Sequence, residues 1–194
     1  FSSYLRKYAQ VAKRALISKE DLALYEAIRV LSDLKENPTS TPEQISAAEV
    51  DLNHKSKSIS HISEASELSR MNWWTAEYGL IGDLKNPKIY GAGLLSSVGE
   101  SRWCLSEKVK KIPMSLDCIK YTYDITEPQP QLFVTPDFKT LEKVLDQMAD
   151  TMAFKTGGTR GLDKALKTEV VNTIEIDGVI QVGGQLESYR LDEQ

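Results

Sequence analysis

Residues 71–105 read MNWWTAEYGLIGDLKNPKIYGAGLLSSVGESRWCL, and they carry the strongest signal in the chain. A glutamate, Glu77, follows a pair of tryptophans, and a turn of small residues, YGAGLLSS at 90–97, comes next. Trp73 and Glu77 are four residues apart, so they share a face if the segment is helical. A carboxylate beside an indole in a partly dry cleft is costly without a cation, which makes a metal ion a natural partner for Glu77. Considered alone, Glu77 would more simply pair with a lysine or arginine on a helix surface.

The helix that carries this glutamate should run from about Ser63 to Tyr78 and end at Gly79. Apolar and small residues keep helical spacing through this region, and glycine commonly closes a helix. A new helix should begin at about 94–97, after two glycines that permit a close approach of the backbone. As an isolated pattern, G-x-G is weak evidence for a site, and a simple tight turn is its default interpretation.

Two separated stretches resemble the pterin-dependent aromatic amino acid hydroxylases. WWTAEYG, residues 73–79, is similar to the family pattern W-[WF]-T-x-E-[YF]-G, and YDITEPQP, residues 123–130, is similar to its Y-x-[VI]-T-E-x-Q-P segment. Two motifs in the correct order are far more specific than either alone. The resemblance implies a monooxygenase that uses iron(II), tetrahydropterin and oxygen to hydroxylate an aromatic amino acid, with phenylalanine to tyrosine as the first expectation.

Glu77 matches the carboxylate of the family's iron site, where two imidazoles and one carboxylate leave the other positions open. The chain has two histidines, His54 and His61, seven residues apart. On a helix that spacing sets them about 10 Å apart along the axis, too far for both rings to reach one metal, so we interpret them as surface residues. The resemblance places the family's histidine segment before Phe1. We therefore expect a truncated piece with one iron ligand, inactive by itself and without bound iron or pterin.

The resemblance also assigns the surroundings of the iron. The positions that match the substrate pocket are Trp73, Gly93 and Ser96, the last hydrogen-bonding an iron-bound histidine in the family. Tyr123 and Thr126 match the active-site wall. Asn72 matches a position that bounds the pterin site, where an aromatic residue is expected in animal members.

The expected fold class is mainly α with minor β: a partial hydroxylase catalytic domain with a β-hairpin near the C-terminus. Residues 1–153 would form the C-terminal portion of the catalytic domain, with a helical insertion at about 20–60. Residues 154–194 would form a helix and hairpin extension. The region 24–52 is longer than the link expected in animal members, and such links are associated with a bacterial branch.

Local signals mark the ends of several elements. Ser18 with Asp21, and Thr41-Pro42 with Gln44, predict two capped helix starts, and a polar break is expected at 53–60.

Three further elements are expected toward the C-terminus. Alternation over 121–126 predicts a strand. Helical spacing from Phe138 to Met148 predicts a helix that starts at Thr135-Pro136. Asp177-Gly178, between two β-rich runs, predicts a hairpin with a type I′ turn.

The composition excludes several classes of protein. At 194 residues, 41% hydrophobic and 27% charged, the chain has the composition of a folded domain. A net charge of -4 with mixed signs argues against nucleic acid as a partner. No apolar run approaches the roughly 20 residues that cross a bilayer, so no membrane partner is expected. Cys104 and Cys118 lack metal-ligand spacing and are expected to be reduced, buried thiols of a cytoplasmic protein.

The functional expectation is therefore part of a phenylalanine 4-monooxygenase. The alternative is a non-catalytic helical interaction module that has kept a hydroxylase scaffold, and it predicts that the whole gene lacks the histidine pair. Self-association is also expected, through an apolar face formed by Trp73, Trp74 and the turn at 91–97.

Overall fold

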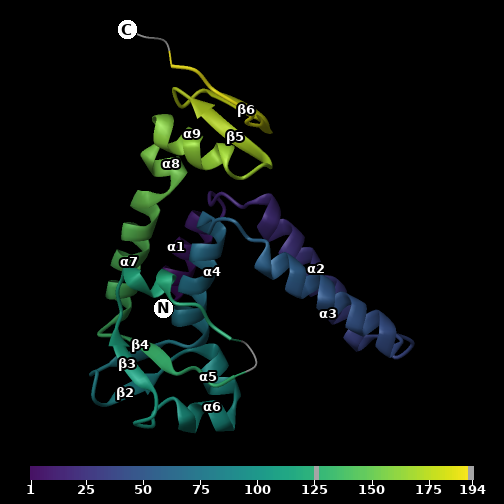
Figure 1. Cartoon of the computed structure of the whole chain (residues 1–194). Coiled ribbons are helices and arrows are strands. Elements are labelled where there is room, and N and C mark those ends of the chain that lie inside the picture. The colour runs from purple at the N-terminus through teal and green to yellow at the C-terminus, as the bar shows by residue number, and fades with distance from the viewer. Residues whose placement is uncertain (125–126, 192–194) are drawn as a thin grey trace. The chain divides into compact units, whose positions relative to one another are not determined.

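The computed structural model describes residues 1–124 and 127–191 (Figure 1). Most of the regular structure in these residues is helical, and two small sheets accompany the helices. This confirms the expected class, mainly α with minor β. The chain divides into two compact units: unit 1 is formed by residues 1–15 and 67–156, and unit 2 by residues 16–66 and 157 onward. The boundary predicted at residue 153 stays a prediction.

Unit 1 combines short helices with a four-stranded sheet. Its helical segments are α1 (Ser2–Ala12), α4 (Glu64–Asn72, which begins in unit 2), η1 (Trp73–Glu77), α5 (Ala92–Ser96), α6 (Val98–Trp103), η2 (Leu116–Lys120), α7 (Phe138–Thr151) and α8 (Ala153–Thr156). Its strands are β1 (Leu80–Gly82), β2 (Pro87–Ile89), β3 (Lys110–Pro113) and β4 (Gln131–Thr135). The strand order is β2-β1-β4-β3; β2 is antiparallel to β1, and the other two pairings are parallel.

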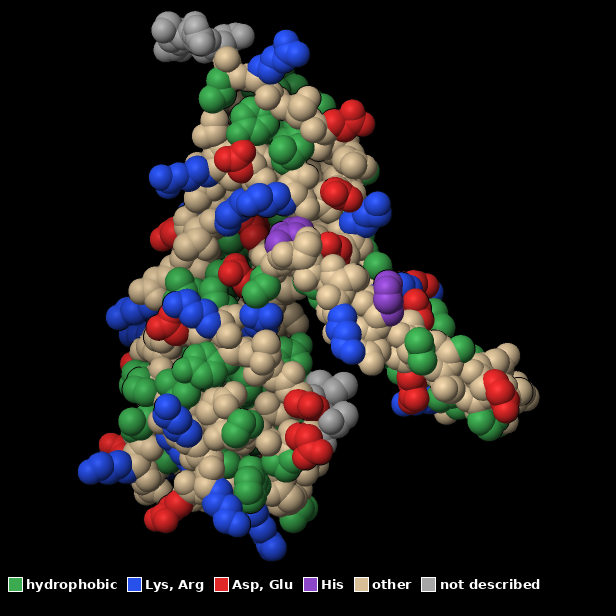
Figure 2. Space-filling view, viewed as in Figure 1, with side chains coloured by type: hydrophobic (Ala, Val, Ile, Leu, Met, Phe, Trp, Pro, Cys, Tyr) green, Lys and Arg blue, Asp and Glu red, His purple; other side chains and the backbone are tan. Residues whose placement is uncertain are grey.

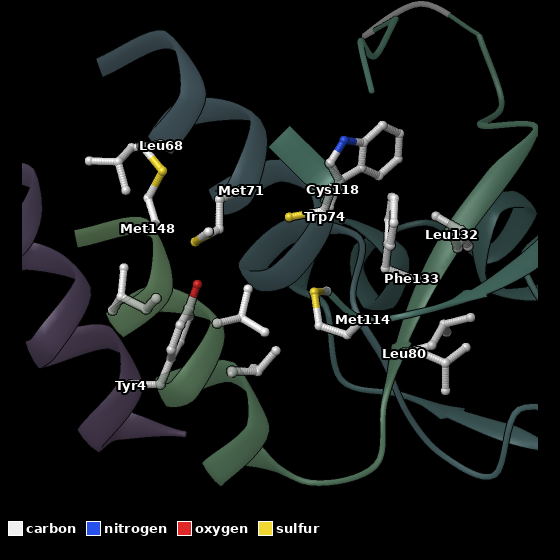
Figure 3. Close-up of a cluster of buried hydrophobic side chains, with 14 of the residues drawn as sticks. Tyr4, Leu68, Met71, Trp74, Leu80, Met114, Cys118, Leu132, Phe133 and Met148 are labelled. Carbon is white, nitrogen blue, oxygen red and sulfur yellow. The ribbon is translucent and has the colours of Figure 1, made fainter. Parts of the chain in front are cut away.

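The core of unit 1 forms where α1, α4, α7 and the central strand β4 meet (Figure 3). Leu132, Phe133 and Val134 of β4 are all buried, as a strand covered on both faces should be. The inward stripe of α7 and the fully buried Trp74 complete the cluster. Lys7 of α1 forms an ion pair with Asp146 of α7 at 2.6 Å, at the rim of this core.

Two predictions in this region were wrong in their bounds. Residues 121–124 form no regular strand, and the neighbouring 125–126 lie outside the described residues. The strand is β4 instead, because its side chains pack into the core while Tyr121 is exposed. The N-cap of α7 is Asp137, whose carboxylate accepts from the Thr140 amide at 2.7 Å, and not Thr135-Pro136.

Unit 2 contains a pair of long helices and a β-hairpin. Its elements are α2 (Lys19–Glu36), α3 (Pro42–Lys57), α9 (Gly158–Leu166), β5 (Val171–Ile176) and β6 (Ile180–Gln185), and α2 and α3 lie side by side (Figure 1). Both predicted capping boxes are present. Ser18 and Asp21 exchange hydrogen bonds at the start of α2, and Thr41 and Gln44 do so at the start of α3.

The polar break was predicted at 53–60, but its predicted start is wrong, because α3 continues to Lys57. Lys55 forms an ion pair with Asp51 one turn earlier, at 2.8 Å, and basic residues in a last turn are favoured by the helix dipole. His54 is exposed on this turn, and His61 is half-buried with Nδ1 4.0 Å from a Glu20 carboxylate oxygen. Figure 2 shows both histidines at the surface, as predicted.

The predicted hairpin is confirmed. Asp177 and Gly178 have φ of 52° and 69°, the two positive values that a type I′ turn requires, and the Val179 amide donates to the Ile176 carbonyl at 3.1 Å.

The surface charges and the two cysteines are arranged as the sequence predicted. Lysine, arginine, aspartate and glutamate side chains are interspersed over the face in Figure 2. No helix among residues 1–124 and 127–191 is long and apolar enough to cross a membrane. Cys104 and Cys118 are free and fully buried, and burial raises the pKa of the Cys118 thiol to about 12.

Candidate functional site

Glu77 is the last residue of a π-helical turn. The turn η1 directly continues α4, and the Tyr78 amide donates to the Trp73 carbonyl at 2.8 Å, an i→i+5 hydrogen bond. The sequence predicted a helix ending at Gly79, which is close, but gave no sign of the wider turn. Single π turns are rare in helices, and those that do occur often lie at functional sites.

The Glu77 side chain is half-buried. Within the part of the chain that the structure describes, its carboxylate forms no hydrogen bond or ion pair. The next residue, Tyr78, has its pKa raised by burial first, and then by the charges of Glu100 and Glu77. A partly desolvated carboxylate without a protein cation is available to bind a cation from outside.

The small-residue turn packs directly against the backbone of Glu77. A Cβ atom at Gly91 would lie 2.5 Å from the Glu77 carbonyl oxygen and 2.6 Å from the Gly79 nitrogen. At Gly93 it would lie 3.1 Å from the same oxygen and 3.0 Å from the Tyr78 ring. The Gly91 amide donates to the Gly79 carbonyl at 3.0 Å. A side chain at Gly91 would therefore clash with this backbone, whereas one at Gly93 would require its neighbours to move by a few tenths of an ångström.

An aromatic stack lies on the same turn. The Trp73 ring is stacked between Tyr78 and Tyr123, with ring centroids 4.5 and 4.3 Å away. The Tyr123 hydroxyl lies 3.3 Å from Ser69 Oγ, so the outer ring is also tied to α4. Three flat rings in contact form a rigid apolar surface.

The other predicted residues have less defined surroundings. Ser96 is exposed on α5, and its hydroxyl donates to the Gly93 carbonyl at 2.9 Å. Asn72 is half-buried and immediately precedes the π turn. Thr126 lies outside the described residues. The structure thus brings Trp73, Glu77, Gly93 and Tyr123 to one turn.

Metal ligands do not cluster in the described ranges, 1–124 and 127–191: no group of three histidine, cysteine, aspartate or glutamate side chains is placed to hold an ion. Both histidines belong to unit 2, whereas Glu77 belongs to unit 1.

Comparison with known proteins identifies the family. The family model described as biopterin-dependent aromatic amino acid hydroxylase matches residues 46–158, more than half of the chain. The chain belongs to this hydroxylase family. The matched region contains the Glu77 turn, the glycine turn and the segment at 123–130.

Several curated relatives of the chain are named phenylalanine-4-hydroxylase. Phenylalanine-4-hydroxylase of Mus musculus is 39% identical over 89 residues, which cover 44% of this chain and 19% of the relative. The Homo sapiens protein of that name is 39% identical over 87 residues. The Vibrio cholerae protein is 35% identical over 92 residues, 46% of this chain and 31% of the relative. The matches therefore span about a fifth to a third of these relatives' length.

Solved structures of phenylalanine hydroxylases are also similar to the chain. The Legionella pneumophila structure has a TM-score of 0.41 and 30% identity, and covers 53% of this chain and 46% of that one. The Chromobacterium violaceum structure, described as iron- and phenylalanine-bound, has a TM-score of 0.41 and 26% identity, and covers 62% of this chain and 42% of that one.

Two residues near the π turn, Tyr78 and Glu100, were not predicted from the sequence to belong to the site. The sequence places Tyr78 at the end of the helix and inside the WWTAEYG motif, and the structure adds that its ring stacks on Trp73. Glu100 of α6 is half-buried, and burial raises its pKa. No sequence signal linked Glu100 to Tyr78, because that proximity arises from the packing of the chain after the glycine turn.

We expect Gly91→Ala to destabilise the hydroxylase chain by about 3 kcal/mol, since the added methyl meets backbone atoms that cannot rotate away. Gly91 has φ -64° and ψ 134°, which alanine adopts freely, so the effect is purely steric. Gly99→Ala is the matched control, because the nearest atom to its Cβ, Ser97 Oγ, is 3.9 Å away. Urea unfolding followed by circular dichroism measures both. Equal stability of the two variants would contradict the close approach at Gly91.

Proposed function

We propose that Glu77 is the carboxylate ligand of an iron(II) site in a tetrahydropterin-dependent monooxygenase that converts phenylalanine to tyrosine. The observation that carries this proposal is a half-buried carboxylate with no hydrogen-bond or ion-pair partner among residues 1–124 and 127–191. Family membership and the shared name of the relatives support it. A carboxylate fits an iron(II) site with two imidazoles, and we propose that both imidazoles come from outside these 194 residues.

The residues around Glu77 have separate tasks in this proposal. Bound iron and tetrahydropterin supply the oxygen chemistry, and the protein supplies position and exclusion of water. Trp73, Gly93 and Ser96 bind the aromatic amino acid. We assign the wall beside it to Tyr123 and, from the match to the family motif alone, to Thr126, which lies outside the described residues. Asn72 lies next to the pterin.

The stacked rings explain how the pocket would select an aromatic substrate. Tyr78 and Tyr123 hold the Trp73 ring in one orientation. Because these two rings cover the faces of the indole, a substrate ring would contact the edge of the stack, and a fixed edge loses no side-chain freedom on binding. The absence of a side chain at Gly93 lets the glycine turn pack against the Tyr78 ring, since a Cβ atom there would lie 3.0 Å from that ring.

We further propose a bacterial-type, cytoplasmic enzyme that self-associates. Two free, buried cysteines agree with a reducing compartment. The face proposed for self-association from the sequence needs correction, because Trp74 is fully buried and cannot contribute to it. Leu95 and Val98, 63% and 74% exposed, are the apolar residues that remain available beside the glycine turn.

The proposal is tested with the full-length protein that contains this chain. Tyrosine formation from phenylalanine and tetrahydropterin should stop when iron is removed by a chelator and return when iron(II) is added. The isolated 194-residue chain should retain no stoichiometric iron after dialysis, because it provides one of the ligands only. Absence of turnover, together with a full-length sequence that lacks a histidine pair, would favour the interaction module instead.

A further inference from the structure

A buried hydroxyl of α1 reaches the middle of the π turn. Tyr4 and Thr75 are each 1% exposed, and their hydroxyl oxygens lie 2.9 Å apart although the residues are 71 positions apart in sequence. Figure 3 shows the Tyr4 ring entering the core from α1, with its hydroxyl pointing toward the side of Met71. Thr75 also contacts the Met71 carbonyl oxygen, at 2.6 Å.

Proton counting fixes the direction of this chain of hydrogen bonds. A threonine hydroxyl has one hydrogen to donate and two lone pairs. The Met71 carbonyl can only accept, so the Thr75 hydrogen points to it. Tyr4 must then donate to Thr75 Oγ1. Hydrogen bonds in such a series strengthen one another in a dry core.

These bonds are made at the point where the helix widens. Thr75 is the central residue of the five-residue turn, two positions before Glu77. A threonine hydroxyl that donates to the carbonyl one turn earlier bends a helix locally. Tyr4 keeps Thr75 in that arrangement from the core side, while Gly91 and Gly93 contact the Glu77 carbonyl from the glycine turn.

We propose that Tyr4 is a positioning residue for Glu77: its hydroxyl, through Thr75, fixes the π turn and thereby the direction of the carboxylate. This inference rests on the proposed role of Glu77 as a metal ligand. A ligand must be fixed to a fraction of an ångström for a metal site to keep its geometry, and such fixing comes from hydrogen bonds behind the ligand.

Tyr8 offers a matched control within the same two helices. It lies one turn after Tyr4 on α1, and its hydroxyl donates to the Leu68 carbonyl of α4 at 2.8 Å. Tyr8→Phe therefore removes a hydrogen bond between the same helices before the turn begins. Any effect specific to Tyr4→Phe must come from the π turn.

Hydrogen exchange followed by mass spectrometry on the full-length protein is the direct test. The peptide that covers residues 73–79 is compared with one from α7, residues 141–149. Tyr4→Phe should speed exchange of the first about tenfold relative to the second, the effect of losing roughly one buried hydrogen bond. Tyr8→Phe should leave this ratio unchanged. Equal ratios in the two variants would overturn the inference.

Variants of Thr75 separate the effect of its hydroxyl group from the effect of its side-chain packing. Thr75→Ser keeps the hydroxyl and should keep the slow exchange, whereas Thr75→Val, of similar shape, should match Tyr4→Phe. Adding Thr75→Val to Tyr4→Phe should produce no further change, because both variants break one chain of bonds.

Iron affinity, measured by competition with a chelator, provides a second readout. Tyr4→Phe should weaken it about tenfold, as is typical for groups behind a metal ligand, and Tyr8→Phe should not. If Glu77→Gln leaves iron affinity unchanged, the proposed metal site fails, while the exchange ratios still decide whether Tyr4 fixes the turn. Faster exchange in Tyr4→Phe with unaltered iron affinity, in a protein where Glu77→Gln does weaken binding, would refute positioning.

Discussion

Glu77→Gln should reduce tyrosine formation by the full-length protein by more than about 100-fold, since loss of a direct ligand exceeds the loss measured for groups that merely orient one. The amide keeps the size of the side chain but removes the negative charge that balances a cation. Because Glu77 is half-buried and has no partner among the described residues, the substitution breaks no hydrogen bond or ion pair of the fold. Stability should therefore stay near that of the parent while turnover and bound iron are lost.

Glu100→Gln is the matched control for that experiment. Glu100 is also half-buried, and its charge also raises the Tyr78 pKa. If the loss in Glu77→Gln came only from changing the charge beside the aromatic stack, Glu100→Gln would show a loss of similar size. We expect a far smaller one. Full turnover in Glu77→Gln, with iron retained, would rule out its role as ligand.

Trp74→Ala should destabilise the chain by about 3–5 kcal/mol, the range found when a large buried side chain is truncated in a core. Trp74 is fully buried, its ring centroid lies 5.6 Å from that of Phe133, and its indole nitrogen donates to the Tyr121 carbonyl at 3.0 Å. Because domains are stable by only about 5–15 kcal/mol, this one substitution is expected to remove much of the margin. Urea unfolding followed by far-ultraviolet circular dichroism measures the loss.

Trp103→Ala is the comparison that separates burial from residue type. Trp103 is half-buried at the end of α6, and Lys108 lies over its ring, so its removal leaves space that solvent can enter. We expect a clearly smaller loss of stability. Trp74→Phe, which keeps most of the volume, should fall between the two alanine variants. Equal losses for Trp74→Ala and Trp103→Ala would show that Trp74 does not anchor this core.

Features that depend on neighbours in sequence were predictable. The capping boxes at Ser18 and Thr41 were correct because a cap is a contact between residues three positions apart. The Asp177-Gly178 turn was correct because only a few residue types adopt two consecutive positive φ values. The two motifs were enough to indicate the family and its glutamate, which the comparison then confirmed at the level of the family.

Features that depend on distant residues were decided by tertiary structure. The adjacent tryptophans Trp73 and Trp74 look equivalent in sequence. Packing buries Trp74 against Phe133 and leaves Trp73 half-buried in a stack with Tyr123. The strand expected at 121–126 lies at β4, because core packing outweighs an alternating pattern.

The candidate site itself shows the same division. Sequence alone predicted that Glu77 and the glycine turn belong to one site, because their residue types and spacing match a family motif. It could not show the π turn, which depends on the contact of Thr75 with Tyr4, 71 residues away, and on glycines that let the chain return against the Glu77 backbone. Such contacts depend on how the core closes, and no local pattern of residues encodes them.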